Sequence, residues 1–305
     1  MISEGARRVR AARQAVAAVF LLELGGGLIF AFAVARAFSM IYGRNPLFAR
    51  GVAGDDVALS LALQLKAPAL TALGASGLAL LLAWKLASFY LAAGLTGALA
   101  RRGFGATAAA RFGGFVRLSL WSLIPYAAAA ALGAAGIMLV DPRLEDLTAW
   151  DTMIGLPALG LIPGLLVWIV TSLAVDLGRA RLVRDGGGSA RALGSGLARA
   201  VTRPRLLGHY LLYLLVWLAI SGLFVAVTAG QDFPGAGGAW LLFVLRQATA
   251  GGRFLARSVA TGGQVAALEA DVVELREVPE RGEALADVGR VQAAQPIERE
   301  SLDGE

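Results

Sequence analysis

Charged side chains inside long apolar runs are the residues of this chain that could do chemistry. Glu23 and Lys85 each interrupt such a run, and Arg246 and Arg253 lie in or beside the last one. An ionised side chain is costly inside a bilayer, so such groups face the protein interior and are paired or protonated. They could form a proton relay or a cation site, but a structural ion pair is the commoner use and the favoured interpretation.

Glu23 lies on a helix face of small residues, because Gly26 and Gly27 follow it at helical spacing. Such a face allows close approach of another helix, which indicates that Glu23 points into the bundle. Counting residues from the helix ends places Glu23 close to the depth of Arg253. The sequence therefore predicts an ion pair between Glu23 and Arg253, with Lys85 as the second choice of partner.

A second candidate site is a glycine- and proline-rich stretch, GLPALGLIPG, in the fourth apolar run. Pro157 and Pro163 each lack a backbone N–H, so together with Gly160 and Gly164 they predict a kinked or interrupted helix. Freed carbonyls at such a break could line a cavity, and transporters place substrates there. A kink that serves only helix packing is the commoner alternative and is favoured here.

The residue counts exclude several classes of chemistry. The chain has no Cys and one His, His209, which excludes thiolate sites, cysteine nucleophiles, His-based metal clusters and ordinary Ser-His triads. The short glycine-rich segments lack the partner residues of phosphate-binding loops. Enzymes that modify lipids usually carry a cluster of His, Asp or Ser at one membrane depth. The sequence shows no such cluster. We therefore expect no metal, no cofactor and no enzymatic activity.

The apolar runs themselves predict the elements that position these residues. With 57% apolar and only 16% charged residues, the 305-residue chain has too few polar side chains to cover a soluble domain. A helix of about twenty apolar residues crosses the hydrocarbon core of a bilayer. The sequence predicts an all-α, polytopic helical membrane bundle over residues 15–262. Its six spans are predicted at 15–42, 68–99, 118–140, 152–175, 206–229 and 238–255.

Connecting segments that are alternately rich and poor in Arg predict the orientation of the spans. The N-terminal segment 1–14 and the loops after the second and fourth spans are Arg-rich, whereas the loops between them are acidic. Since basic loops stay in the cytoplasm, both termini are predicted to be cytoplasmic. The same rule accounts for the basic clusters, so nucleic-acid binding is not predicted. Two alternatives stay open: a cleaved signal peptide as the first span, which its length and Glu23 disfavour, and an interfacial sixth helix.

The loop after the fourth span has the pattern of a short amphipathic helix at 190–202. Ser189 could cap it, and Leu193, Leu197 and Val201 share one face. We expect this helix to lie on the cytoplasmic face of the membrane, although an ordinary solvated connector is the alternative. The arginines expected to contact anionic lipid headgroups are Arg191, Arg199, Arg203 and Arg205.

Beyond the sixth span, apolar residues at helical spacing predict that the helix extends over 263–278 and ends before Pro279. The remaining residues 279–305 are polar and acidic. This composition is typical of a disordered tail.

The second half of the chain resembles a known group of membrane families. Three segments, VDLGRARLVRDGG, SARALGSGLARAVTRPRLLGHYLLYLLVW and RQATAGGRFLARSVA, resemble six-span bacterial families of unknown function related to the membrane domain of glycerophosphoryl diester phosphodiesterases. The likeness covers roughly residues 165–265. It implies a helical membrane domain that is often paired with another activity, but the catalytic barrel of the phosphodiesterases is absent from this sequence.

Two hypotheses for function follow. The first is a non-enzymatic protein of the bacterial inner membrane that organises, regulates or assists partners in the bilayer, through a protein partner or through self-association. The second is a transporter of a small molecule, lipid or ion that uses the broken fourth helix and Glu23. A polar cavity that reaches Glu23 would favour transport, whereas closed packing around Glu23 would favour the first hypothesis.

Overall fold

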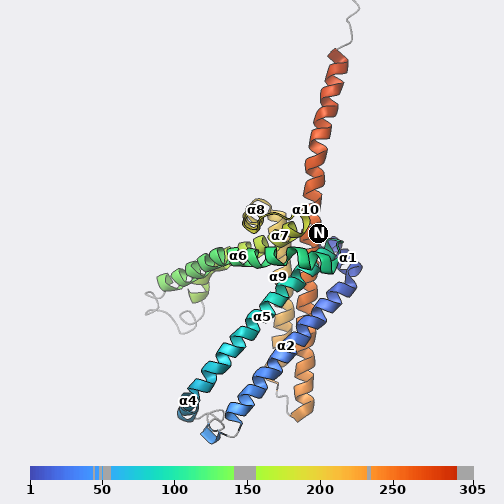
Figure 1. Ribbon diagram of the computed structural model, residues 1–305. Helices are drawn as coiled ribbons and strands as arrows, with labels where there is room; N and C mark the ends of the chain where they lie inside the picture. The colour runs from blue at the N-terminus through green and yellow to red at the C-terminus, as the bar shows by residue number, and fades with distance from the viewer. Residues whose placement is uncertain (44, 48–49, 51–55, 141–155, 232–234, 294–305) are drawn as a thin grey trace, which may run out of the picture.

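The computed structural model describes residues 1–43, 45–47, 50, 56–140, 156–231 and 235–293. Within these ranges every regular element is a helix (Figure 1). The helices are α1 (Ile2–Ala11), α2 (Arg13–Tyr42), α4 (Asp56–Leu65), α5 (Ala67–Leu99), α6 (Phe104–Val140), α7 (Leu156–Asp185), α8 (Ser189–Thr202), α9 (Pro204–Thr228) and α10 (Gly235–Ala293). The prediction of an all-α protein is confirmed for this part of the chain.

Five helices of the described chain are long and apolar enough to cross a membrane. They occupy Arg13–Tyr42, Gly74–Leu99, Phe104–Leu139, Ala158–Asp185 and Pro204–Thr228. The 30 residues of α7 rise about 45 Å, the thickness of a bilayer with its headgroup regions. The sixth predicted span lies in α10, which is not among these five helices. Its glycines and the polar pair Arg246–Gln247 lower the mean hydropathy of the segment.

The helices meet at one end, in a buried cluster that we call the hub. The hub joins the C-terminal parts of α5 and α7, the N-terminal parts of α6 and α9, the whole of α8 and a middle segment of α10. Its largest buried side chains include Phe115, Leu118, Leu173, Leu177, Leu182 and Leu268. Figure 1 shows α2 with α5 and α6 with α7 as two pairs that diverge from the hub.

The diverging halves of the helices expose large apolar side chains. Ile29 in α2, Leu78 in α5, Leu139 in α6 and Leu223 in α9 are all exposed. Apolar surface of this extent marks contact with a membrane or with another protein. The helices are therefore packed together at the hub and expose apolar side chains away from it, as expected of helices that enter a bilayer.

The glycine- and proline-rich stretch is a packing surface and not a helix break. Helix α7 is continuous across Pro163, and Pro157 is its second residue, where a missing N–H breaks no helical hydrogen bond. A Cβ added to Gly160 would lie 2.7 Å from the carbonyl oxygen of Gly136, and one added to Gly164 would lie 2.5 Å from that of Ala129. Helix α7 therefore has no interruption here, and the contacts of these glycines with the α6 backbone agree with the favoured interpretation, in which the stretch serves helix packing.

Helix α8 forms at the predicted place, and most of its predicted apolar face packs inward: Leu193 is buried and Leu197 packs against the hub. Ala192, Gly196 and Ala200 form its buried stripe, and a Cβ on Gly196 would lie 2.3 Å from the carbonyl oxygen of Ala174 in α7. Val201, predicted to share the buried face, is 71% exposed. The small residues add to the buried surface of α8, because Gly196 allows this close crossing of α7.

The predicted N-cap of α8 also needs correction. The capping position belongs to Gly188, which makes no side-chain cap hydrogen bond. The hydroxyl of Ser189 instead donates to the carbonyl oxygen of Gly114 in α6, at 3.1 Å. Ser189 thus ties α8 to the hub.

The N-terminal segment is a helix docked on α10. A Cβ on Gly5 would lie 2.1 Å from the carbonyl oxygen of Val259, so α1 crosses α10 at a glycine. Next to this contact, buried Arg8 donates to both carboxylate oxygens of Glu269, at 3.2 and 2.6 Å, and to the carbonyl oxygen of Leu99. Glu269 raises the pKa of Arg8, which stays charged and holds α1, α5 and α10 together.

Helix α10 is longer than predicted. It continues through Pro279 to Ala293 and, in Figure 1, runs past the hub and away from the other helices. The predicted helix end at Pro279 is therefore wrong. The last part of the predicted tail, residues 294–305, lies outside the described residues.

Candidate functional site

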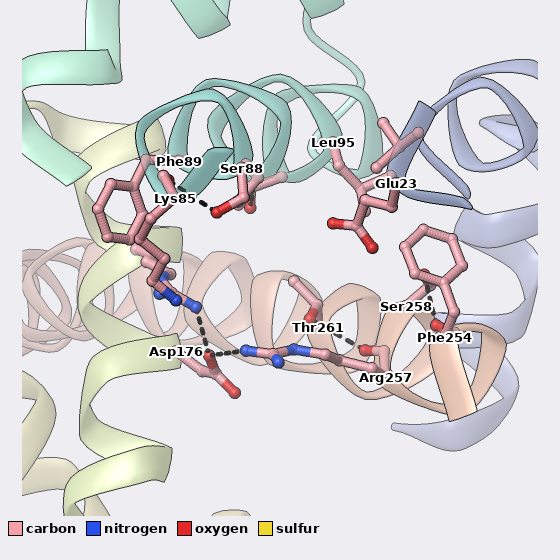
Figure 2. A pocket seen from close by; sticks show the side chains of 14 residues that line it. Glu23, Lys85, Ser88, Phe89, Leu95, Asp176, Phe254, Arg257, Ser258 and Thr261 are labelled. Atoms are coloured by element: carbon pink, nitrogen blue, oxygen red, sulfur yellow. Dashed lines mark hydrogen bonds and ion pairs between the residues drawn. The ribbon is translucent and has the colours of Figure 1, made fainter. Parts of the chain in front are cut away.

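Charged side chains from four helices surround one cavity close to the hub. Glu23 comes from α2, Lys85 from α5, Asp176 and Arg179 from α7, and Arg257 from α10. The cavity has a volume of about 220 Å³, and we call it the polar cavity (Figure 2). Segments far apart in the sequence thus bring two acidic and three basic groups together.

Asp176 is the centre of this group because two guanidinium groups contact the same carboxylate oxygen. Arg179 Nη1 lies 3.3 Å and Arg257 Nη2 lies 3.6 Å from Asp176 Oδ1. The Asp176 side chain is 11% exposed, whereas that of Arg257 is 55% exposed and borders the open part of the cavity. The Asp176 carboxylate raises the pKa of Arg257, which therefore remains a cation.

Glu23 faces the same cavity from the opposite wall. Figure 2 shows its carboxylate pointing into the cavity, toward the helix that carries Arg257 and Thr261. Among the described residues it has no ion-pair partner. The adjacent turn is fixed by Gly26, where an added Cβ would lie 2.1 Å from the ring of Trp84. The predicted inward direction of Glu23 agrees with this arrangement.

A second, more apolar cavity of about 470 Å³ lies on the other side of Glu23, between α2 and α10. Arg246 lines it together with Leu28, Phe243 and Ala250. Glu23 therefore stands between a charged space and an apolar one. Arg246, named with Glu23 among the charges of the apolar runs, thus shares this cavity with it, without an ion pair between them among the described contacts.

Arg253 does not pair with Glu23 among the contacts of the described residues. Its guanidinium donates to the hydroxyl of Ser221 and lies 4.5 Å from the ring centroid of Trp217, both on α9. The residue of α10 that faces the cavity with Glu23 is Arg257, four positions later. The predicted pair fails because the rotation of α10 directs Arg253 toward α9.

Lys85 lies at the junction of the polar cavity with a third and larger space. This space, of about 730 Å³, is bounded by α5, α6, α7 and α9 and by Arg257 of α10, and we call it the lateral groove. Lys85 is exposed and lies 5.3 Å from the ring centroid of Phe89. It has no ion-pair partner among the described residues, so its charge is available to a bound group.

Sequence patterns found only part of this site. Glu23 and Lys85 were identified because a charge within an apolar run needs an explanation. Arg179 belongs to an Arg-rich segment that topology already explains, and Asp176 stands just before it at the end of the fourth apolar run, so neither residue stands out in the sequence. Their spacing of three residues on one helix face was the available signal for an ion pair. Gly160, Pro163 and Gly164 line none of the three cavities.

The described residues include no group of three or more His, Cys, Asp or Glu side chains that could hold a metal ion. His209 lies away from the charged group, against Gly263 of α10. Comparison of the chain with protein families, with curated proteins and with solved structures found no match.

Proposed function

We propose that this chain is a multi-pass protein of a bacterial inner membrane that binds a charged small molecule or lipid group in the polar cavity, as a transporter does. The observation that carries this proposal is a cavity that reaches Glu23 and is lined by five charged side chains from four helices. Removing charged groups from bulk water is costly, and a protein that served only as a scaffold would gain more from apolar packing. The role proposed for the fourth helix changes: it supplies Asp176 and Arg179 and not a broken backbone.

In the proposed orientation the hub faces the cytoplasm, with both termini on that side. The basic side chains around the hub support this orientation, because such residues are retained in the cytoplasm. The arginines proposed to contact anionic headgroups there are Arg191, Arg199, Arg203 and Arg205.

A second candidate function is the assembly of membrane partners. It is favoured by glycines of α2 and α5 that face open space: a Cβ added to Gly27, Gly74 or Gly77 would contact nothing within 4 Å. Small residues on an exposed helix face are suited to close association with another membrane helix. The weak resemblance to membrane domains that accompany other activities supports the same candidate.

Cysteine labelling tests the proposed cavity, because the chain has no Cys of its own. We expect Ser88→Cys, in the cavity wall, to react with a small charged thiol reagent roughly tenfold or more faster than Leu161→Cys, since a thiolate forms in water and not in hydrocarbon. The reaction should occur from the side that labels Gly188→Cys, near the hub, and not from the side that labels Gln231→Cys. Equal, slow rates for Ser88→Cys and Leu161→Cys would contradict a water-accessible cavity.

A further inference from the structure

The lateral groove has two chemically different halves. The half next to the polar cavity presents Lys85, Asp176, Arg179 and Arg257, and the other half presents apolar side chains of α5, α6 and α7. We propose that the groove binds one anionic phospholipid, with its phosphate against the three cations and an acyl chain along the apolar half. This inference rests on the proposed function and names the class of ligand.

The charges of the groove favour an anion. Three cationic side chains face a single carboxylate, so the groove carries an excess of two positive charges when all are ionised. Asp176 already contacts both Arg179 and Arg257, and Lys85 has no ion-pair partner among the described residues. A phosphate that accepts hydrogen bonds from Lys85 and the two guanidinium groups would offset this excess.

Two hydrogen-bond donors next to the groove lack a partner among the described residues. Arg179 Nε is buried and lacks a partner among the described residues, although the other end of this guanidinium contacts Asp176. The hydroxyl of Ser119, in the wall of the groove, is likewise buried without a partner. Both atoms are covered by protein and face no open space, so the proposal of an anion rests on the excess positive charge of the groove.

The apolar half of the groove fits a hydrocarbon chain. Leu82 and Leu123 line it and are 58% and 59% exposed, and Trp168 is also largely uncovered. A free phosphate or another small soluble anion would leave this half empty, whereas a phospholipid would fill both halves.

The position of Arg179 along its helix agrees with a contact to a lipid headgroup, whereas Lys85 lies deeper, 14 residues or about 21 Å before the end of α5. Arg179 lies six residues before the end of α7, which places it about 9 Å along the helix from that end. The headgroup region of a bilayer is about 5 to 8 Å thick on each side of the hydrocarbon core. Arg179 therefore lies close to the boundary where the phosphate of a lipid meets its acyl chains.

Lipid titration of the full chain in detergent, followed by native mass spectrometry and thermal unfolding, tests this proposal. We expect phosphatidylglycerol to bind and raise the Tm, and phosphatidylcholine to bind at least about tenfold more weakly. Lys85→Gln should weaken phosphatidylglycerol binding by a similar factor. Lys66, the other lysine of the sequence, lies outside the groove. The matched change Lys66→Gln should therefore leave phosphatidylglycerol binding unchanged.

A second variant tests the apolar half without changing any charge. Leu123→Trp should fill the groove and weaken lipid binding, whereas Leu132→Trp, on the same helix but outside the groove, should not. Equal stabilisation of all variants by phosphatidylglycerol would overturn the proposal, because it would indicate a general solvent effect of the lipid. Binding of inorganic phosphate with the same dependence on Lys85 and no dependence on Leu123 would also overturn it.

The outcomes separate this inference from the proposed function. Fast labelling of Ser88→Cys without selective lipid binding would leave the polar cavity in place and make the lipid assignment wrong. Slow labelling would contradict the cavity itself, whichever lipid binds.

Discussion

Replacing Asp176 by asparagine is expected to destabilise the protein by about 1 to 3 kcal/mol, because it leaves Arg179 and Arg257 close together without their shared carboxylate. A fully buried pair would lose more, but the Arg257 side chain is 55% exposed and water screens part of the repulsion. Thermal unfolding in detergent measures the loss. We also expect ligand binding in the polar cavity to change, since both arginines would be released from Asp176.

The matched control is Asp185→Asn on the same helix. Asp185 is 40% exposed and contacts Arg184 and Arg181, so its loss should cost no more than about 1 kcal/mol. Adding Arg257→Met to Asp176→Asn should recover part of the stability by removing one of the two unpaired cations. If Asp176→Asn is no more harmful than Asp185→Asn, Asp176 is not the centre of the site.

The second large effect is expected at the contact of α6 with α7. A Cβ on Gly136 would lie 1.9 Å from the carbonyl oxygen of Gly160, so any larger side chain must push the two backbones apart. Gly136→Leu should therefore cost about 3 kcal/mol or more, the upper end of the usual cost of overpacking. The expected measurement is a large fall in Tm, and Gly136→Ala should give a smaller fall in the same direction.

Gly222→Leu on α9 is the control for the change in hydrophobicity and helix propensity. A Cβ at Gly222 would meet nothing within 4 Å, and the residue is exposed. This variant should leave the Tm nearly unchanged. Equal effects of leucine at Gly136 and Gly222 would contradict the close crossing of α6 and α7.

Hydropathy and helix length were sufficient to predict five of the membrane helices. The sixth predicted span is not among these five helices for a physical reason. Arg246 and Gln247 interrupt its short apolar run, which lies in α10. The alternative of an interrupted helix at Pro163 fails because a proline removes one donor without ending a helix whose neighbours hold it in place. Glycine contacts with α6 supply that support here.

The candidate site was predicted only where a charge stood alone in an apolar run. Glu23 and Lys85 met this condition, and both line the polar cavity. The partner on α10 could not be predicted, because a rotation of that helix decides whether Arg253 or Arg257 faces α2. Asp176 was hidden by its position, since an acidic residue at the end of a span beside several arginines has an ordinary explanation in topology.

An experimental structure in nanodiscs of phosphatidylglycerol would test the existence of the charged cavity most directly. We predict that Asp176 lies within ion-pair distance of both Arg179 and Arg257, and that Glu23 faces the same open cavity from α2. The charged cavity would be contradicted if side chains filled that space, Glu23 bonded to Arg253 and Asp176 pointed away from α10.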